Sequence, residues 1–265
     1  SLFLGADRKY PCATCKLRYG FGPHACPGHE GQIELNTTVY APEMIKHVAA
    51  TLANVCFFCS RALDPKSKYG KYACKECHKP QPTKWAVVYG IRIVPLWKPG
   101  SSRSECPTVY SLTQDEKQYA LEAFTPDKAH RILANIRASD LTYLGYLNPE
   151  KTHPLYFVWK YMPVISTKFR PRCVRPGMTS KGLHDLTALY LQVLKASLEL
   201  KKVRRVVELY GQIKHDVGLL RKHELNKSKY EDAKYKIEAV QDDIQVWVCL
   251  VVGQDPRKNA NRVKP

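Results

Sequence analysis

Two short motifs near the start of the chain, Cys12-Ala13-Thr14-Cys15 and Cys26-Pro27-Gly28-His29, set its architecture because together they predict a metal site. A Cys-x-x-Cys pair lets two sulfurs reach one ion from a tight turn, and Pro27-Gly28 gives the second pair similar local geometry. Three thiolates and one imidazole complete a tetrahedral zinc site with no open position, so we expect a structural site and not a hydrolytic one. His24 lies in the ten-residue spacer and is an alternative ligand, but the spacing from Cys26 favours His29.

A second cluster consists of Cys56-Phe57-Phe58-Cys59 and, fourteen residues later, Cys74-Lys75-Glu76-Cys77. Two Cys-x-x-Cys pairs at this separation strongly indicate another structural zinc site, here with four thiolates. Reduced structural cysteines or a redox pair are the alternatives. His78 follows Cys77 directly and is better explained as a neighbour than as a ligand. Three further cysteines have no partner at metal spacing and are expected to be ordinary thiols: Cys106, Cys173 and Cys249.

Composition limits the class of protein. The 265 residues are 44% hydrophobic, enough for one large or two small domains. No apolar run approaches the roughly 18 to 20 residues of a membrane span, and no signal peptide is visible.

The chain begins without Met and ends in a loop-like sequence, so we expect a segment of a longer polypeptide. The net charge of +18 favours a polyanionic partner, although a basic surface for solubility or protein contacts is the alternative.

Periodicity predicts both helices and strands. We expect a helix near Pro42–Asn54, a strand over Trp85–Val94, a helix that begins after the N-cap Thr125, and a strand over Leu155–Val164. Beyond these lie two stripes with alternating spacings of three and four, which favour an antiparallel helical hairpin over two independent amphipathic helices. The stripes are Leu183, Leu186, Tyr190, Val193, Ser197 and Leu200, then Tyr230, Ala233, Ile237, Val240, Ile244, Trp247 and Val251.

The first motif continues as Glu30-Gly31-Gln32-Ile33-Glu34-Leu35, and the whole resembles the clamp zinc motif of the largest subunit of eukaryotic, archaeal and large-DNA-virus RNA polymerases. That motif reads C-x-T-C, a spacer, then C-P-G-H-x-G-x-I-x-L. Further similarities follow in the family's order along the chain. They are Cys77 to Gln81-Pro82, Leu144-Gly145-Tyr146-Leu147-Asn148-Pro149, His153-Pro154, Met162-Pro163-Val164 and Phe169-Arg170-Pro171.

Departures from the family pattern favour a divergent polymerase, viral or specific to one lineage. The first zinc spacer is four residues longer than the common cellular one, the third ligand of the second site usually lies further from its fourth, and the proline-rich loop is degraded.

The resemblance implies an α+β fold: a zinc-knuckle clamp core with small β elements and a projecting antiparallel helical hairpin, the clamp coiled coil. It implies four parts. Residues 1–82 form a two-zinc module, and 83–182 form a mixed α/β core that ends in a lid-like loop. Residues 183–252 form the hairpin, and 253–265 form a basic, rudder-like loop that continues into the rest of the subunit.

Two basic loops are candidates for contact with DNA and the RNA–DNA hybrid, because cationic side chains on loops reach phosphates without reading sequence. Incidental solvated charge is the alternative for each loop. The candidate residues are Lys168, Arg170, Arg172 and Arg175 in the first loop, and Arg257, Lys258, Arg262 and Lys264 in the second.

Catalysis is expected elsewhere in the enzyme. The family's nucleotidyl transfer uses two metal ions on the aspartates of N-A-D-F-D-G-D, and this sequence lacks that motif. We therefore expect two structural Zn²⁺ ions here, and Mg²⁺ only at the polymerase active site outside this chain. The expected partners are the other polymerase subunits, including the second-largest, the nucleic acids, and transcription factors at the hairpin, with no membrane.

Location and alternatives complete the sequence-based hypothesis. We expect an intracellular protein, in the nucleus or, if viral, in the virion or a cytoplasmic factory. A stand-alone zinc-stabilised nucleic-acid-binding protein explains the charge and the cysteines equally well, but not the ordered run from Leu144 to Pro171. A zinc hydrolase or deaminase needs an open metal site, and four ligands are already available in each cluster.

Overall fold

The computed structural model describes residues 11–12, 14–18, 25–26, 28–64, 66, 72–97, 112–170, 184–223 and 225–256. The chain forms two compact units. Unit 1 comprises Ser1–Asn36 and Lys160–Gln254, and unit 2 comprises Thr37–Trp159 and Asp255–Pro265. The first cysteine cluster lies in unit 1 and the second in unit 2. The four parts expected from the sequence stay a prediction. Over the described residues the fold is mixed, with helices and two two-stranded sheets, as expected.

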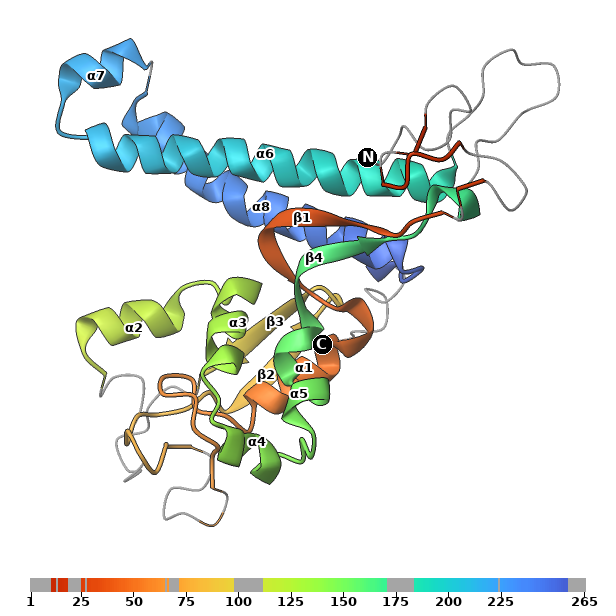
Figure 1. Ribbon diagram of the computed structural model, residues 1–265. Coiled ribbons are helices and arrows are strands. Elements are labelled where there is room, and N and C mark those ends of the chain that lie inside the picture. Colours follow the sequence, from red (N-terminus) through yellow and green to blue (C-terminus); the bar gives the residue numbers. More distant parts are fainter. Residues whose placement is uncertain are drawn as a thin grey trace. The chain divides into compact units, whose positions relative to one another are not determined.

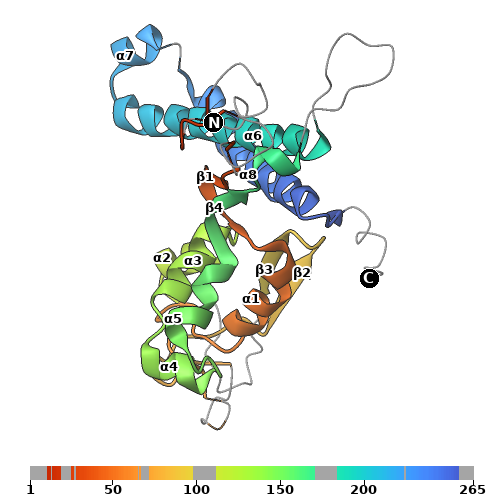
Figure 2. The same cartoon turned by 45° about the vertical axis from the view of Figure 1, so that its right-hand side comes forward.

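In unit 1, two long helices lie side by side and antiparallel, as both Figure 1 and Figure 2 show. They are α6 (Asp185–Ile213) and α8 (Lys227–Val251), and the short helix α7 (Val217–Lys222) lies between them in sequence. The rings of Tyr210 and Tyr230 stack at 4.5 Å where α6 ends and α8 begins. The buried residues of the predicted stripes are Tyr190, Val193, Ser197 and Leu200 on α6 and Ala233, Val240 and Ile244 on α8. Beyond Ile244 the buried hydrophobic residues are Val248 and Cys249, whereas the predicted Trp247 and Val251 are only partly buried.

Strand β1 (Gly31–Tyr40) pairs with β4 (Val158–Val164) in a two-stranded sheet. Within unit 1, Asn36 ties β1 to α6: its side-chain amide donates to Ser197 O at 2.8 Å, and Arg204 donates to Asn36 O at 2.6 Å. The expected strand over Leu155–Val164 begins three residues late, because Pro154–Phe157 forms a 3₁₀ turn (η4).

Unit 2 is built around a hydrophobic core formed by helices and a β-hairpin. The single strand expected over Trp85–Val94 is wrong: the structure has β2 (Lys84–Val88) and β3 (Arg92–Leu96), antiparallel. The chain reverses over Val88–Ile91, where Ile91 N donates to Val88 O at 3.1 Å and Tyr89 and Gly90 have positive φ angles of 52° and 71°. The other elements of the unit are η2 (Pro42–Met44), α1 (Ile45–Leu52), α2 (Gln114–Leu121), α3 (Pro126–Ala134), α4 (Ala138–Tyr143) and α5 (Pro149–Thr152).

Helix α3 begins where the sequence predicts. Thr125 Oγ1 accepts a hydrogen bond from Lys128 N, which satisfies one of the free N–H groups of the first turn. Ala129, Ile132 and Leu133 then point into the core and are almost fully buried. These residues are at positions i, i+3 and i+4, which lie on one face of a helix. The predicted helix after Thr125 is therefore confirmed.

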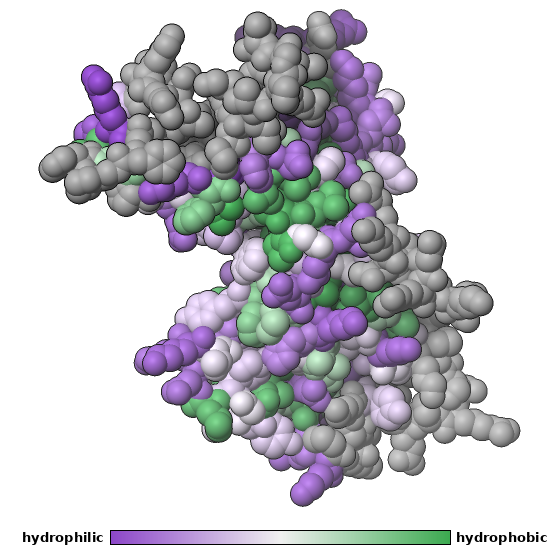
Figure 3. Space-filling view, turned by 90° about the vertical axis from the view of Figure 1, so that its right-hand side faces the viewer, coloured by the Kyte–Doolittle hydropathy of each residue, from purple (hydrophilic) through white to green (hydrophobic). Residues whose placement is uncertain are grey.

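The surface is mixed in character. Figure 3 shows one face on which hydrophilic side chains alternate with patches of hydrophobic ones. In unit 2, the exposed large hydrophobic residues include Tyr143, Leu147 and Tyr156. None of the helices in the described ranges is long and apolar enough to cross a membrane.

Candidate metal centres

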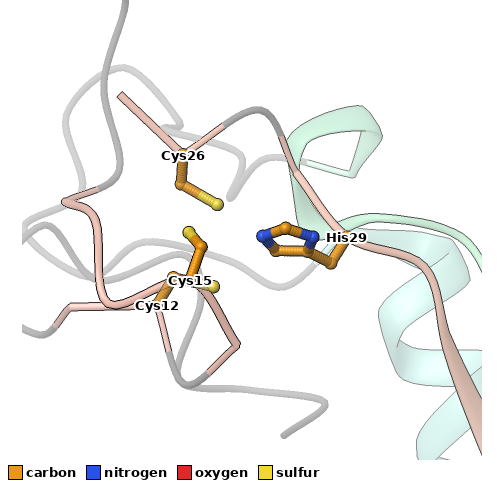
Figure 4. Close-up of side chains that lie close together, drawn as sticks. All are labelled: Cys12, Cys15, Cys26 and His29. Atoms are coloured by element: carbon orange, nitrogen blue, oxygen red, sulfur yellow. The ribbon is translucent and has the colours of Figure 1, made fainter. Parts of the chain in front are cut away.

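The first cluster brings together the four residues expected from the sequence. One ligand atom each from Cys12, Cys15, Cys26 and His29 lies within 4.8 Å of the others, and Figure 4 shows these side chains pointing toward one another. Cys12 and Cys26 are buried, and His29 lies two residues before the start of β1. Within the described residues, His29 Nε2 is buried with no hydrogen-bond partner. A buried ring nitrogen facing three thiols fits a zinc ligand. His24, the alternative, lies outside the described residues.

Three of the four cysteine turns share one backbone pattern. The N–H of the residue after the second cysteine donates to the carbonyl of the first cysteine, and the N–H of the first cysteine donates to the carbonyl five residues on. The residue after the second cysteine has a positive φ in each case. The residues concerned are Cys12, Lys16 and Leu17; Cys56, Ser60 and Arg61; and Cys74, His78 and Lys79. His78 therefore has a backbone role in the turn, and it is not in the metal-ligand group.

The fourth turn, Cys26 to His29, depends on glycine. Gly28 has a φ of +90°, and a Cβ built there would lie 2.4 Å from Ser166 Oγ. A φ of +90° is larger than the 53° to 62° of the other three turns and strains any residue with a Cβ, and the close approach of Ser166 disfavours a side chain further. Gly28 N also lies 3.4 Å from Cys26 Sγ, so the same residue directs an N–H at a candidate ligand.

The second cluster gathers Cys56, Cys59, Cys74 and Cys77, again with their ligand atoms within 4.8 Å. Two sulfur–sulfur distances, Cys56 to Cys77 and Cys59 to Cys74, are 3.6 and 3.5 Å. These distances are far longer than the roughly 2.05 Å of a disulfide. They are close to the edge of about 3.8 Å of a tetrahedron whose Zn–S bonds are about 2.3 Å. The residues therefore fit a zinc ion.

The protonation of these thiols makes metal binding pH-dependent. Burial raises the pKa of Cys56 and raises that of Cys59 to about 11. In the absence of a cation, both thiols are therefore protonated at neutral pH. A zinc ion has to displace these protons, so its affinity falls as pH falls.

The contacts of two residues around the second cluster were not found by sequence reasoning, although Gln81 belongs to the similarity that runs from Cys77 to Gln81-Pro82. Gln81 is 4% exposed, and its side-chain nitrogen donates to Cys56 Sγ at 3.2 Å. Phe57, between two ligands, is buried in an aromatic cluster, which the Phe-Phe insertion of Cys56-Phe57-Phe58-Cys59 could have indicated. The cluster comprises Phe57, Phe58, Trp85, Trp97, Tyr119 and Phe124.

The candidate phosphate-binding residues are only partly described. Lys168 is exposed in the 3₁₀ turn η5 (Thr167–Phe169). Arg170 is 4% exposed; its guanidinium donates to Ile165 O at 3.0 Å and to Thr187 Oγ1 at 3.1 Å. It holds η5 against α6, and this arrangement disfavours the phosphate contact expected for Arg170. The six other candidates, Arg172, Arg175, Arg257, Lys258, Arg262 and Lys264, lie outside the described residues.

Both cysteine clusters and the first long helix, α6, lie in a region that one family of known proteins matches. The family model for RNA polymerase Rpb1, domain 1, matches residues 2–224. The chain belongs to this family. The match extends through both cysteine clusters, α6 and α7, and it confirms the resemblance to the N-terminal part of the largest polymerase subunit.

Individual relatives agree with this membership. The chain is 27% identical over 208 residues to DNA-directed RNA polymerase subunit Rpo1N of Methanocaldococcus jannaschii, covering 72% of this chain and 14% of that protein. It is 25% identical over 218 residues to DNA-directed RNA polymerase II subunit RPB1 of Euplotoides octocarinatus (74% and 44%). It is 24% identical over 207 residues to a probable RPB1 homolog of Invertebrate iridescent virus 6 (70% and 19%). The chain thus spans less than half the length of these curated relatives.

Proposed function

We propose that this Rpb1 domain 1 chain is the N-terminal clamp part of the largest subunit of a DNA-directed RNA polymerase, where it helps to hold template DNA and the RNA–DNA hybrid. The observation that carries the proposal is the family match over residues 2–224. The net charge of +18 supports contact with a polyanion. In this proposal the chain contributes to nucleotidyl transfer only by positioning nucleic acid, since the catalytic aspartates and their Mg²⁺ belong to another part of the enzyme.

The two metal centres act as structural supports in this proposal. Each offers four protein ligands, so a bound Zn²⁺ would supply cross-linking and no open position for a substrate. The helical pair α6 and α8 serves as the clamp coiled coil and as a docking surface for transcription factors. Exposed hydrophobic residues such as Tyr143 and Leu147 are available to other subunits, including the second-largest. The proposed location is intracellular: the nucleus or, for a viral enzyme, the virion or a cytoplasmic factory.

Native mass spectrometry of the complex purified through this chain tests the proposal. We expect an assembly of several polymerase subunits that carries zinc on this component. A free chain of 30.2 kDa with two zinc ions would instead support the alternative, a stand-alone zinc-stabilised nucleic-acid-binding protein.

Lys168 provides a residue-level prediction. Replacing Lys168 by glutamine is expected to weaken binding of the zinc-loaded chain to an RNA–DNA hybrid and to reduce the slope of log affinity against log salt by about one, because one phosphate contact is lost. The matched control is Lys201→Gln, another exposed lysine of unit 1 on α6. Binding is measured by fluorescence anisotropy at several salt concentrations. Equal salt slopes for the parent chain and Lys168→Gln would show that Lys168 makes no phosphate contact.

A further inference from the structure

The second metal centre has a buried amide beside its ligands. Gln81 lies four residues after Cys77, and its side chain is nearly enclosed, with 4% of the residue exposed. A buried amide is costly unless its polar atoms find partners. Within unit 2 those partners are parts of the two cysteine turns.

Gln81 makes three hydrogen bonds through its side chain. Its Oε1 accepts from Phe57 N at 2.8 Å, inside the first turn. Its Nε2 donates to Lys79 O at 3.0 Å, just after the second turn, and to Cys56 Sγ at 3.2 Å. The NH₂ group has two hydrogens and both are used. The amide thus connects the two turns, which are separated by fourteen residues in sequence.

The orientation of the amide is fixed by its surroundings. With oxygen and nitrogen exchanged, the oxygen would face a carbonyl and a thiolate sulfur, while the NH₂ group would face the N–H of Phe57. All three contacts would become repulsive, so the hydrogen-bond network admits one orientation. The atom of Gln81 that faces Cys56 Sγ is therefore the amide nitrogen, which donates a hydrogen bond to the sulfur.

The sulfur of Cys56 receives several donors. Besides Gln81, the backbone N–H groups of Phe58 and Cys59 point at Cys56 Sγ, each at 3.4 Å. These donors stabilise the negative charge of a thiolate. The backbone donors come from the turn itself and occur whenever it forms. The Gln81 donor comes from outside the turn and requires the second turn to be in place.

We propose that Gln81 is a positioning residue of the second metal centre: it locks the two cysteine turns together and stabilises the Cys56 thiolate in the zinc-bound site. Partners that orient metal ligands in this way contribute about 10- to 100-fold in metal affinity. The proposal rests on the candidate metal centre and not on the polymerase function, because it is tested in the free, zinc-loaded chain.

The experiment compares Gln81→Met and Gln81→Glu with the parent chain. Methionine keeps the length of the side chain and removes all three hydrogen bonds. Glutamate keeps the acceptor for Phe57 N but loses the donor to sulfur and adds negative charge. The matched control is Gln245→Met, because Gln245 is also a buried glutamine, 2% exposed, that lies beside the non-ligand Cys249 in unit 1.

Release of zinc to a chromogenic chelator is measured first. In Gln81→Met we expect one of the two zinc ions to leave about 10- to 100-fold faster, and in Gln81→Glu at least as fast, while the other ion and both ions of Gln245→Met keep parental rates. Replacement of zinc by Co²⁺ supplies the second readout. We expect the sulfur-to-cobalt charge-transfer band to move to lower energy in both Gln81 variants, because a thiolate without its donor is more electron-rich.

Two results would overturn the proposal. The first is a pair of Gln81 variants with parental release rates and an unchanged cobalt band. The second is faster release without any change in the band, which would mean that Gln81 contributes only to packing. If Gln81→Met fails to fold, the same two criteria are applied to Gln81→Glu, which retains the length and one hydrogen bond of the native side chain.

Discussion

Replacing Cys56 by serine is expected to leave the chain with one zinc ion instead of two and to unfold the part of unit 2 around the second cluster. Cys56 is fully buried and is one of four converging thiols. A structural zinc contributes an apparent binding free energy of about 10 to 16 kcal/mol, as large as the whole stability of a typical domain, about 5 to 15 kcal/mol. Serine supplies no thiolate, so most of this free energy is lost.

The measurement combines zinc content with tryptophan fluorescence. Trp85 and Trp97 contact Phe57, the neighbour of Cys56, so their emission reports the packing beside the metal. Cys249→Ser is the matched control, since Cys249 is buried at 2% exposure but belongs to neither cluster. We expect Cys249→Ser to keep two zinc ions. A Cys56→Ser chain with two zinc ions and parental emission would contradict the assignment of Cys56 as a ligand.

Phe57→Ala is expected to lower the free energy of unfolding of unit 2 by about 3 to 5 kcal/mol, the usual cost of removing a buried phenylalanine. Phe57 is 2% exposed. Its ring lies 5.4 Å from those of Trp97 and Tyr119 and 6.0 Å from that of Phe124. Alanine would leave a cavity between the cysteine turn and the core. Because the ring is not a ligand, the variant should still bind two zinc ions under native conditions.

Urea unfolding of the zinc-loaded chain, followed by fluorescence, measures this effect. Tyr72→Ala is a suitable control, because Tyr72 is 53% exposed and also lies near the second cluster in sequence. We expect the control to change stability by no more than about 0.5 kcal/mol. An equally small change for Phe57→Ala would show that the aromatic cluster does not link the metal site to the core.

The two candidate metal-ligand groups could be predicted from the sequence because their geometry is local. Each Cys-x-x-Cys turn places two ligands within four residues, and the same backbone hydrogen bonds recur at Cys12, Cys56 and Cys74. The helix after Thr125 could be predicted for the same reason, since a cap and one apolar face are local properties. The sequence predicts one strand over Trp85–Val94 where the structure has the hairpin of β2 and β3, because the glycine of Tyr89-Gly90 is the only sequence signal of a turn within the apolar run.

By itself the sequence determined the two groups of candidate metal ligands, most of the buried stripe residues of α6 and α8, and the family. Tertiary structure alone decided which polar side chains are enclosed. Gln81 reaches a sulfur 25 residues away, and Arg170 reaches a hydroxyl 17 residues away. Tertiary structure also decided that the segment with the first cluster joins the long helices in unit 1, where Asn36 of β1 donates to Ser197 O across 161 residues. The second cluster lies in unit 2. Ligand spacing and helical periodicity act over a few residues, whereas these contacts exist only after distant segments have packed together.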